Sequence, residues 1–205
     1  MSDDVPNPID FRDFHVAREW ERDAPVKRPS RPAFFREYAV QMREHTRPVT
    51  SVLELGSGPG FLAQHLLVTC PHLDYTALDF SAAMHQLARA RLGESADRVR
   101  FVERNFREKA WTDGLGSFDC VVTHQAVHEL RHKRYATGLH KQVSAVLHPG
   151  GLYLVCDHFA GRRGMANEQL YMTPQEQKLS LIDAGFESPE LVKCADKLAM
   201  YRAVC

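Results

Sequence analysis

The chain has 205 residues, 44% hydrophobic and 25% charged, a composition ordinary for one globular domain with an appendage. Its 26 basic and 26 acidic residues balance, so composition gives no support to nucleic-acid binding, which normally needs a basic excess. The five cysteines include no Cys-x-x-Cys pair, and no apolar run reaches transmembrane length. We therefore expect a cytoplasmic protein with reduced cysteines, without membrane or nucleic-acid partners, and with an acidic start at residues 1–4 unlike a signal peptide.

Residues 1–48 differ from the rest because six of the 11 prolines lie there, at positions 6, 8, 25, 29, 32 and 48. Two helical segments are predicted within this arm, from Asp10 to about Asp23 and from Ala33 to about His45. The second carries an apolar stripe at four-residue spacing, which favours packing against a core. The stripe consists of Phe34, Tyr38 and Met42.

A glycine-rich turn follows the first predicted strand, an apolar run that stops at Glu54, and a helical pattern begins at Phe61. Glycine has no Cβ, so the turn Gly56-Ser57-Gly58 can lie directly against a ligand and offer its N–H groups to a polar or anionic group. The spacing is Gly-x-Gly-x-Gly rather than the dinucleotide-binding Gly-x-Gly-x-x-Gly. An acid two residues before the first glycine is unfavourable beside a pyrophosphate but favourable beside a cationic amine.

A second strand is predicted from Asp74 to Phe80, which places Asp79 at the carboxyl end, where α/β sheets bind ligands. A carboxylate there can accept hydrogen bonds from both hydroxyls of a ribose, although an Asp that merely starts a helix is the alternative. Ser81 is the expected N-cap of a helix running to about Leu92. Met84 in that helix is interpreted either as a core residue or as a contact for adenine.

The remaining elements continue the alternation of strands and helices expected of an α/β sheet with a terminal hairpin. Helices are expected at about 133–147, stopped by Pro149-Gly150-Gly151, and from a capping box at Thr173–Glu176 to a C′ glycine at Gly185. Further strands are expected at 98–103, 117–123, 152–156, 186–193 and 198–205.

The Glu-x-Gly-x-Gly-x-Gly motif, and the Leu-His-Pro-Gly-Gly-Leu-Tyr-Leu-Val stretch beginning at Leu147, resemble those of class I S-adenosylmethionine (SAM)-dependent methyltransferases, over residues 50–205. This resemblance implies a three-layer, Rossmann-like α/β fold in residues 49–205, with a mostly parallel seven-stranded sheet and a C-terminal antiparallel hairpin. It also implies SAM as cofactor and S-adenosylhomocysteine as product. The implied cofactor-binding residues are Glu54, Gly56, Ser57, Gly58, Asp79, Phe80, Met84, Asn105, Phe106 and His124.

The resemblance also implies a small-molecule acceptor, since the fourth motif reads Thr-His-Gln-Ala and not the Asn/Asp-Pro-Pro-Tyr/Phe typical of base-amine methylation. The acceptor would bind beneath residues 1–48 and the segment 159–172, each interpreted as a lid, and Arg162 and Arg163 suit an acidic acceptor or are simply solvated. The side chains expected to face it from the arm are Phe11, Phe14, His15, Arg18 and Trp20.

The catalytic candidates are His128, Glu129 and His158, near the ends of the fourth and fifth strands with His124 and Gln125. Histidine titrates near neutrality, so His128, with Glu129 nearby, is the first choice of general base and His158 the second. Each is alternatively a hydrogen-bonded residue without a role in proton transfer.

Two rival functions remain. His128-Glu129-Leu130-Arg131-His132 satisfies His-Glu-x-x-His, which on one helix binds zinc in hydrolases, although its position after a buried strand is unlike those enzymes. The other rival is a SAM-binding protein without catalytic activity. An oxidoreductase is disfavoured by the glycine spacing, and the oligomeric state cannot be read from the sequence.

Overall fold

The computed structural model describes residues 4–205, so the first three residues of the predicted acidic start lie outside the description. Seven strands make a mixed sheet in the order β3-β2-β1-β4-β5-β7-β6, which confirms the Rossmann-like α/β prediction. The chain divides into two compact units, Pro8–Trp111 and residues 4–7 with Thr112–Cys205, which we call the N-terminal and the C-terminal unit. In residues 4–205 we find no helix with the length and apolar character needed to cross a membrane.

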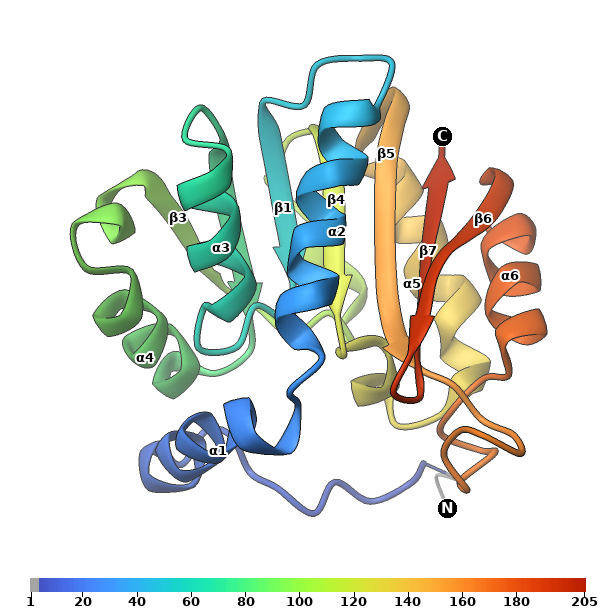
Figure 1. Ribbon diagram of the computed structural model, residues 1–205, viewed down its shortest axis with the longest axis horizontal. Helices are drawn as coiled ribbons and strands as arrows, with labels where there is room; N and C mark the ends of the chain where they lie inside the picture. Colours follow the sequence, from blue (N-terminus) through green and yellow to red (C-terminus); the bar gives the residue numbers. More distant parts are fainter. Residues whose placement is uncertain (1–3) are drawn as a thin grey trace. The chain divides into compact units, whose positions relative to one another are not determined.

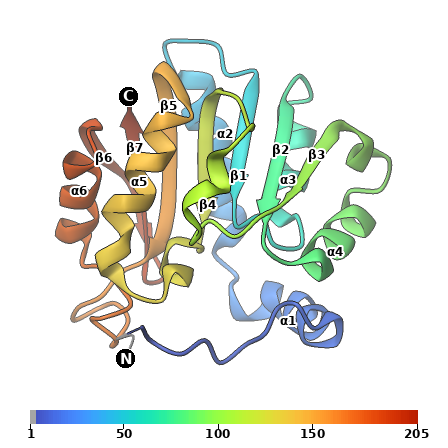
Figure 2. The ribbon, with the colours of Figure 1, turned by 180° about the vertical axis from the view of Figure 1, so that it is seen from behind.

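The N-terminal unit contains three parallel strands, with β2 between β1 and β3. Helix α3 packs against α2, α4 and β2, and it covers β2 on the face seen in Figure 1, whereas Figure 2 shows β2 from the opposite side. The elements are α1 (Phe14–Lys27), α2 (Arg31–Glu44), β1 (Ser51–Leu55), α3 (Phe61–Thr69), β2 (Asp74–Asp79), α4 (Ala82–Leu92), η1 (Gly93–Arg98), β3 (Val99–Glu103) and η2 (Lys109–Thr112).

The two helices of the arm are shifted from their predicted bounds. α1 begins at Phe14 because Asp13 caps it, with Oδ1 accepting the backbone N–H of His15 at 2.8 Å, and it continues past Pro25 to Lys27. α2 begins at Arg31, with a proline in its first turn, where the missing N–H costs nothing. The predicted apolar stripe Phe34, Tyr38 and Met42 is buried.

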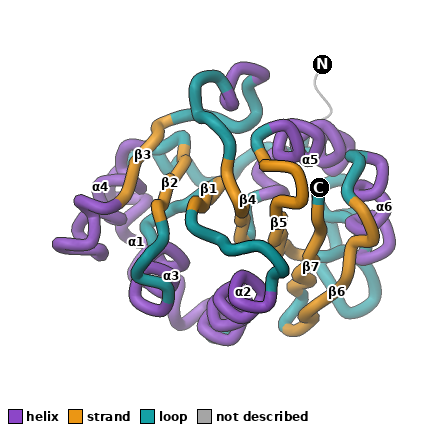
Figure 3. The backbone as a smooth tube through the Cα atoms, turned by 90° about the horizontal axis from the view of Figure 1, so that it is seen from above, coloured by secondary structure: helices purple, strands orange, loops and turns teal. Residues whose placement is uncertain are grey.

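The C-terminal unit combines a parallel pair, β4 and β5, with antiparallel pairs β5–β7 and β7–β6 that form the expected terminal hairpin. Figure 3 shows α5 and α6 on the same side of β5, β7 and β6. The elements are β4 (Phe118–His124), η3 (Val127–Leu130), η4 (Lys133–Tyr135), α5 (Ala136–Ala145), β5 (Leu147–His158), α6 (Pro174–Asp183), β6 (Glu187–Ala195) and β7 (Leu198–Val204).

The boundary between α5 and β5 was wrongly predicted. The helix ends at Ala145, and the strand begins at Leu147 rather than Leu152, because Leu147 already pairs with Phe118. The register of β4 against β5 shifts between Phe118 and Cys120, so the Pro-Gly-Gly stretch is a bulge within the strand. A Cβ at Gly151 would lie 2.7 Å from the carbonyl oxygen of His148, so only glycine fits there.

The predicted capping box is confirmed. Thr173 and Glu176 form the capping box at the start of α6, with Glu176 N–H donating to Thr173 Oγ1 at 3.2 Å and Thr173 N–H to Glu176 Oε2 at 2.7 Å. All five cysteines are free, and Cys70, Cys120 and Cys156 are buried.

Candidate functional site

The glycine turn is tied to the carboxyl end of β2. The backbone N–H groups of Gly56 and Ser57 donate to the carbonyl of Leu78 at 2.8 and 3.0 Å, and that of Gly58 donates to Oδ2 of Asp79 at 2.8 Å. Gly58 has φ +52°, and a Cβ added there would meet no atom of residues 4–205 within 4 Å. The turn therefore leaves open space beside left-handed backbone, which a ligand can occupy.

The third glycine of the motif has a different role. Gly60 has φ +77°, and a Cβ there would lie 3.1 Å from Cβ of Ala88 in α4. Gly60 therefore allows α3 and α4 to pack closely and does not itself face open space.

Asp79 is 6% exposed and oriented by backbone donors on both oxygens, Gly58 N–H on Oδ2 and Ser81 N–H on Oδ1 at 3.0 Å. Ser81 is the N-cap of α4, as predicted, since its Oγ accepts the N–H of Met84 at 3.1 Å. A carboxylate oxygen accepts more than one hydrogen bond, so the two oxygens can also receive two adjacent hydroxyls.

Glu54, 3% exposed in β1, accepts a hydrogen bond from the hydroxyl of Tyr75 at 2.8 Å. Burial raises the pKa of Glu54 to about 8, and the charge of Asp79 adds to this rise, whereas the Tyr75 hydroxyl and the charge of Arg31 oppose it. A cationic amine beside this carboxyl would favour its ionised form.

Ser57 has a buried hydroxyl for which residues 4–205 supply no hydrogen-bond partner. Such a group normally requires a partner. The orphaned hydroxyl, the space at Gly58, the oriented carboxylate of Asp79 and the buried acid Glu54 together fit a ligand that carries a diol, a cationic amine and polar oxygens.

Other predicted cofactor residues are engaged in packing or local hydrogen bonds. Met84 is 3% exposed in a cluster with Ala17, Ala83 and Leu87. Asn105 Oδ1 accepts the N–H of Arg107 at 3.0 Å, and Phe106 is 8% exposed. Phe80 is partly exposed, and His124 is buried at the end of β4.

The arm side chains proposed to face an acceptor separate into two sets. Phe11, Phe14 and Trp20 pack against the Met84 cluster, so part of their surface is used in holding the arm to α4. His15 and Arg18 are exposed on α1.

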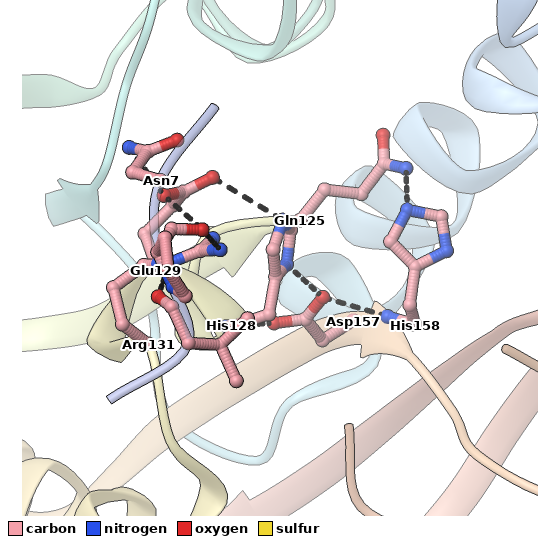
Figure 4. A network of polar contacts seen from close by, with 9 residues as sticks. Asn7, Gln125, His128, Glu129, Arg131, Asp157 and His158 are labelled. Atoms are coloured by element: carbon pink, nitrogen blue, oxygen red, sulfur yellow. Dashed lines mark hydrogen bonds and ion pairs between the residues drawn. The ribbon is translucent and has the colours of Figure 1, made fainter. Parts of the chain in front are cut away.

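In the C-terminal unit, Asp157 at the carboxyl end of β5 organises the catalytic candidates (Figure 4). Its Oδ1 accepts from Nδ1 of His128 at 2.7 Å and from the N–H of His158 at 2.6 Å, and its Oδ2 accepts from the N–H of His128 at 2.8 Å. Gln125 Nε2 lies 2.8 Å from Nε2 of His158. Sequence reasoning did not assign Asp157, although an acid at the end of a buried strand was the signal that identified Asp79.

His128 faces a carboxylate on each ring nitrogen, because Oε1 of Glu129 lies 3.4 Å from its Nε2. Burial alone would lower the pKa of His128, but the charges and hydrogen bonds of Asp157 and then Glu129 outweigh burial and raise it to about 10. Burial is likewise outweighed for both carboxyls, whose pKa values the imidazolium holds below their ordinary range. The structure thus brings His128, Glu129 and His158 together, with His128 protonated at neutral pH.

The His-Glu-x-x-His stretch lacks the geometry of a zinc hydrolase. The short helix η3 ends at Arg131, whose φ of +67° is left-handed, and His132 is extended, with φ −160°. Nδ1 of His132 instead accepts the N–H of Arg134 at 3.1 Å, so the two histidines do not share a helical face. In the described part of the chain, no group of three or more His, Cys, Asp or Glu side chains is arranged so that it could hold a metal ion.

The segment proposed as a lid is held at both ends. Phe159 forms a bridge with Met172, and Ala160 with Met165. Arg162 and Arg163 are exposed between them. The ring of Tyr171 lies 5.6 Å from that of His128 and 5.8 Å from that of His158, measured between centroids.

A family model described as a methyltransferase domain matches residues 52–151. This match and the fold are consistent with the class I SAM-dependent methyltransferase family. The cofactor of this family is SAM, and the residues around the glycine turn fit it. Among curated proteins, the chain is 32% identical over 84 residues to a malonyl-[acyl-carrier protein] O-methyltransferase of Paenibacillus sp. (strain JDR-2), a match covering 40% of this chain and 30% of that relative.

Solved structures of other methyltransferases share the fold. An O-methyltransferase family protein from Burkholderia thailandensis is 20% identical, with a TM-score of 0.74, over 93% of this chain and 60% of that one. Human N-acetylserotonin methyltransferase in complex with SAM is 18% identical, with a TM-score of 0.67, over 95% and 57%. A SAM-dependent methyltransferase from Clostridium acetobutylicum is 11% identical, with a TM-score of 0.72, over 91% and 97%. The chain thus spans under a third of its curated relative and more than half of the first two structures.

Proposed function

We propose that this protein transfers a methyl group from SAM to a small-molecule acceptor. The observation that carries the proposal is the 2.8 Å hydrogen bond from Gly58 N–H to Asp79, which fixes the glycine turn against the tip of β2 while Glu54 lies buried in β1. The acceptor class draws support from human N-acetylserotonin methyltransferase, whose name gives a small-molecule acceptor. The name of the Paenibacillus relative gives instead an acyl group on a carrier protein.

Each cofactor-binding residue has a distinct proposed role. Asp79 accepts the ribose hydroxyls, Glu54 faces the cationic amine, and the Ser57 hydroxyl, which has no partner within residues 4–205, donates to the carboxylate. When bound, SAM supplies an electrophilic methyl group on a sulfonium. The protein's task is then to hold the acceptor in line and to exclude water.

We assign His128 as the general base and Asp157 as the residue that orients it. The acceptor's proton passes to Nε2 of His128, while Asp157 stays ionised and keeps the Nδ1–H in place at 2.7 Å. With a pKa of about 10, His128 is mostly protonated at neutral pH, so the rate should rise as the pH increases towards 10. His158, with Gln125 at 2.8 Å, is the second candidate.

The cofactor assignment is tested by calorimetric titration with SAM. Asp79→Ala should weaken binding about tenfold or more, because hydrogen bonds to a charged group contribute roughly 1.5–3 kcal/mol. The matched control is Asp74→Ala, an exposed acid at the other end of β2, which should leave affinity unchanged. An unchanged affinity in Asp79→Ala would show that the ribose assignment is wrong.

Catalysis is tested by screening metabolite pools for acceptor-dependent release of S-adenosylhomocysteine. His128→Ala should slow turnover about 100-fold, within the usual range for general-base catalysis, and leave SAM affinity unchanged. Tight SAM binding without turnover on any acceptor would indicate a non-catalytic SAM-binding protein.

A further inference from the structure

Arg131 is an unusual residue beside the proposed general base. It is a non-glycine residue in the left-handed region, with φ +67°, and it is 6% exposed. Such backbone is held in place only when the surroundings specify it, and it concentrates at functional sites. Here it ends η3 directly after the His128–Glu129 pair and turns the guanidinium back towards that pair (Figure 4).

The guanidinium distributes its donors over three partners. Nε donates to the carbonyl of Val5 at 3.0 Å, and Nη2 to the carbonyl of Pro6 at 2.6 Å. Nη1 lies 3.5 Å from Oε2 of Glu129. The backbone carbonyl of Arg131 also accepts the N–H of Val5 at 2.8 Å. One buried side chain thus fixes residues 4–7 and contacts the carboxylate beside His128.

Glu129 lies between this arginine and His128. Its Oε1 is 3.4 Å from Nε2 of His128, while its Oε2 is 3.4 Å from Nδ2 of Asn7 and 3.5 Å from Arg131. The Glu129 side chain is 26% exposed, and all three contacts are at the long end for hydrogen bonds. Its position therefore depends on the donors around it.

We propose that Arg131 is a positioning residue that acts through Glu129: with Asn7, it keeps the carboxylate beside Nε2 of His128 and so sets the proton affinity of the imidazole. The consequence for catalysis rests on the proposed function, in which His128 accepts the proton. The other groups that face His128 are the Asp157 carboxylate on Nδ1 and the rings of His158 and Tyr171.

The inference is tested on the ligand-free protein by a nitrogen-15 NMR titration of the histidine rings. Glu129→Gln should lower the pKa of His128 by about one unit, because one of its two carboxylate partners is lost. Arg131→Lys keeps the positive charge but loses the planar guanidinium that reaches three acceptors at once. Glu129 is then no longer held beside His128, so the pKa of His128 should fall by about half a unit. Asn7→Ala, in an exposed residue whose loss does not threaten folding, should lower it in the same direction.

Arg134→Ala is the matched control. Arg134 also holds the N-terminal segment, since its Nη2 donates to Oδ1 of Asp4 at 3.2 Å, a contact that does not involve Glu129. This variant should loosen the segment, seen as faster hydrogen exchange of the Val5 amide, without changing the His128 titration.

An unchanged His128 titration in Arg131→Lys and Asn7→Ala, or an equal fall in Arg134→Ala, would overturn the proposal. Because the titration needs neither cofactor nor acceptor, its outcome is independent of methyl transfer. Failure of the proposed function would show instead as absent S-adenosylhomocysteine release with the titration shifts intact.

Discussion

Each compact unit buries a carboxyl group near the carboxyl end of a parallel strand, and Glu54 of the N-terminal unit and Asp157 of the C-terminal unit have opposite properties. Glu54, 3% exposed, accepts a hydrogen bond from the neutral hydroxyl of Tyr75, and burial raises its pKa to about 8. Asp157, 5% exposed, accepts two backbone N–H groups and the Nδ1–H of His128, and its pKa falls.

Burial itself is nearly the same for both groups, so the partners decide the charge. Asp157 is ionised at neutral pH because its cation and its donors are part of the fold. Glu54 is mostly neutral because burial disfavours its charged form and the Tyr75 hydroxyl offsets that effect only in part. This difference shows that Asp157 has a cationic partner within the fold, whereas Glu54 does not need to be ionised in the free protein, as the proposed pairing of Glu54 with a cationic amine requires.

The largest effect is expected when the pairing of Asp157 with His128 is removed. Asp157→Asn should destabilise the protein by about 3–5 kcal/mol, because it removes the nearer of the two carboxylates that pair with a buried imidazolium and leaves only Glu129 at 3.4 Å. In wild type both carboxylate oxygens of Asp157 accept hydrogen bonds from N–H groups. The NH₂ of the asparagine amide would place a donor opposite one of these donors, so that hydrogen bond would be lost. Urea unfolding at pH 6 measures the loss, with the exposed Asp183→Asn on α6 as control. A loss below 1 kcal/mol would contradict the proposed pairing.

A second test uses the pH dependence of stability. The folded-state pKa of Glu54 lies above its ordinary 4.5, so the folded protein binds more protons than the unfolded chain between pH 4.5 and 8, and stability falls as pH rises through that window. Glu54→Gln keeps an acceptor for Tyr75 and abolishes the ionisation. The variant should gain about 3 kcal/mol relative to wild type between pH 5 and pH 8, by denaturant unfolding.

Glu103→Gln, the same change in an exposed residue of β3, is the control for that series. The raised pKa of His128 makes a later contribution, with stability lost between pH 6.5 and about 10, and it is common to all three proteins. A Glu54→Gln difference that is constant with pH would mean that Glu54 is ionised in the free protein.

A third test asks whether the cofactor supplies the missing cation. If the amine of SAM ionises Glu54, binding releases a proton, and affinity should rise with pH up to about 8, by as much as about tenfold per unit. Calorimetry in two buffers of different ionisation enthalpy measures the proton release. Glu54→Gln should release no proton on binding SAM. If the variant releases as many protons as wild type, they come from a group other than Glu54.

The smallest effect is expected at Tyr75. Tyr75→Phe removes the one hydroxyl that lowers the pKa of Glu54, so that pKa should rise further above 8. The cost in stability at pH 7 should be about 1 kcal/mol, the usual net contribution of a hydrogen bond. Denaturant unfolding of Tyr75→Phe, Glu54→Gln and the double variant forms a double-mutant cycle, which gives the interaction free energy between the two side chains. Additive losses would show that they are not coupled.

Local sequence patterns were sufficient for most of the fold. The stripe in α2, the Ser81 cap and the capping box of α6 were read correctly because they involve residues three or four apart. The turn motif and the position of Asp79 likewise follow from short spacings and a rule about strand ends. The predicted start of β5 at Leu152 is wrong. The Pro-Gly-Gly stretch suggested a turn between the helix and the strand, but Leu147, which precedes this stretch, already pairs with Phe118 of β4.

The partners in the site could not be predicted in the same way. Tyr75 is 21 residues from Glu54, Asp157 is 29 from His128, and Val5 is 126 from Arg131. Residue periodicity contains no information about such contacts, which depend on the packing of whole elements. The left-handed conformation of Arg131 had no sequence signal, and it is this conformation that separates His128 from His132.

The bond between Gly58 and Asp79 has a consequence for the speed of ligand capture. This hydrogen bond orders the Gly56–Gly58 turn in the folded protein before any ligand binds. A nucleoside that binds beside the turn therefore does not have to order a flexible loop. The entropy of ordering the backbone is therefore absent from the association step. Encounter and desolvation, rather than loop rearrangement, should govern how fast the ligand is taken up.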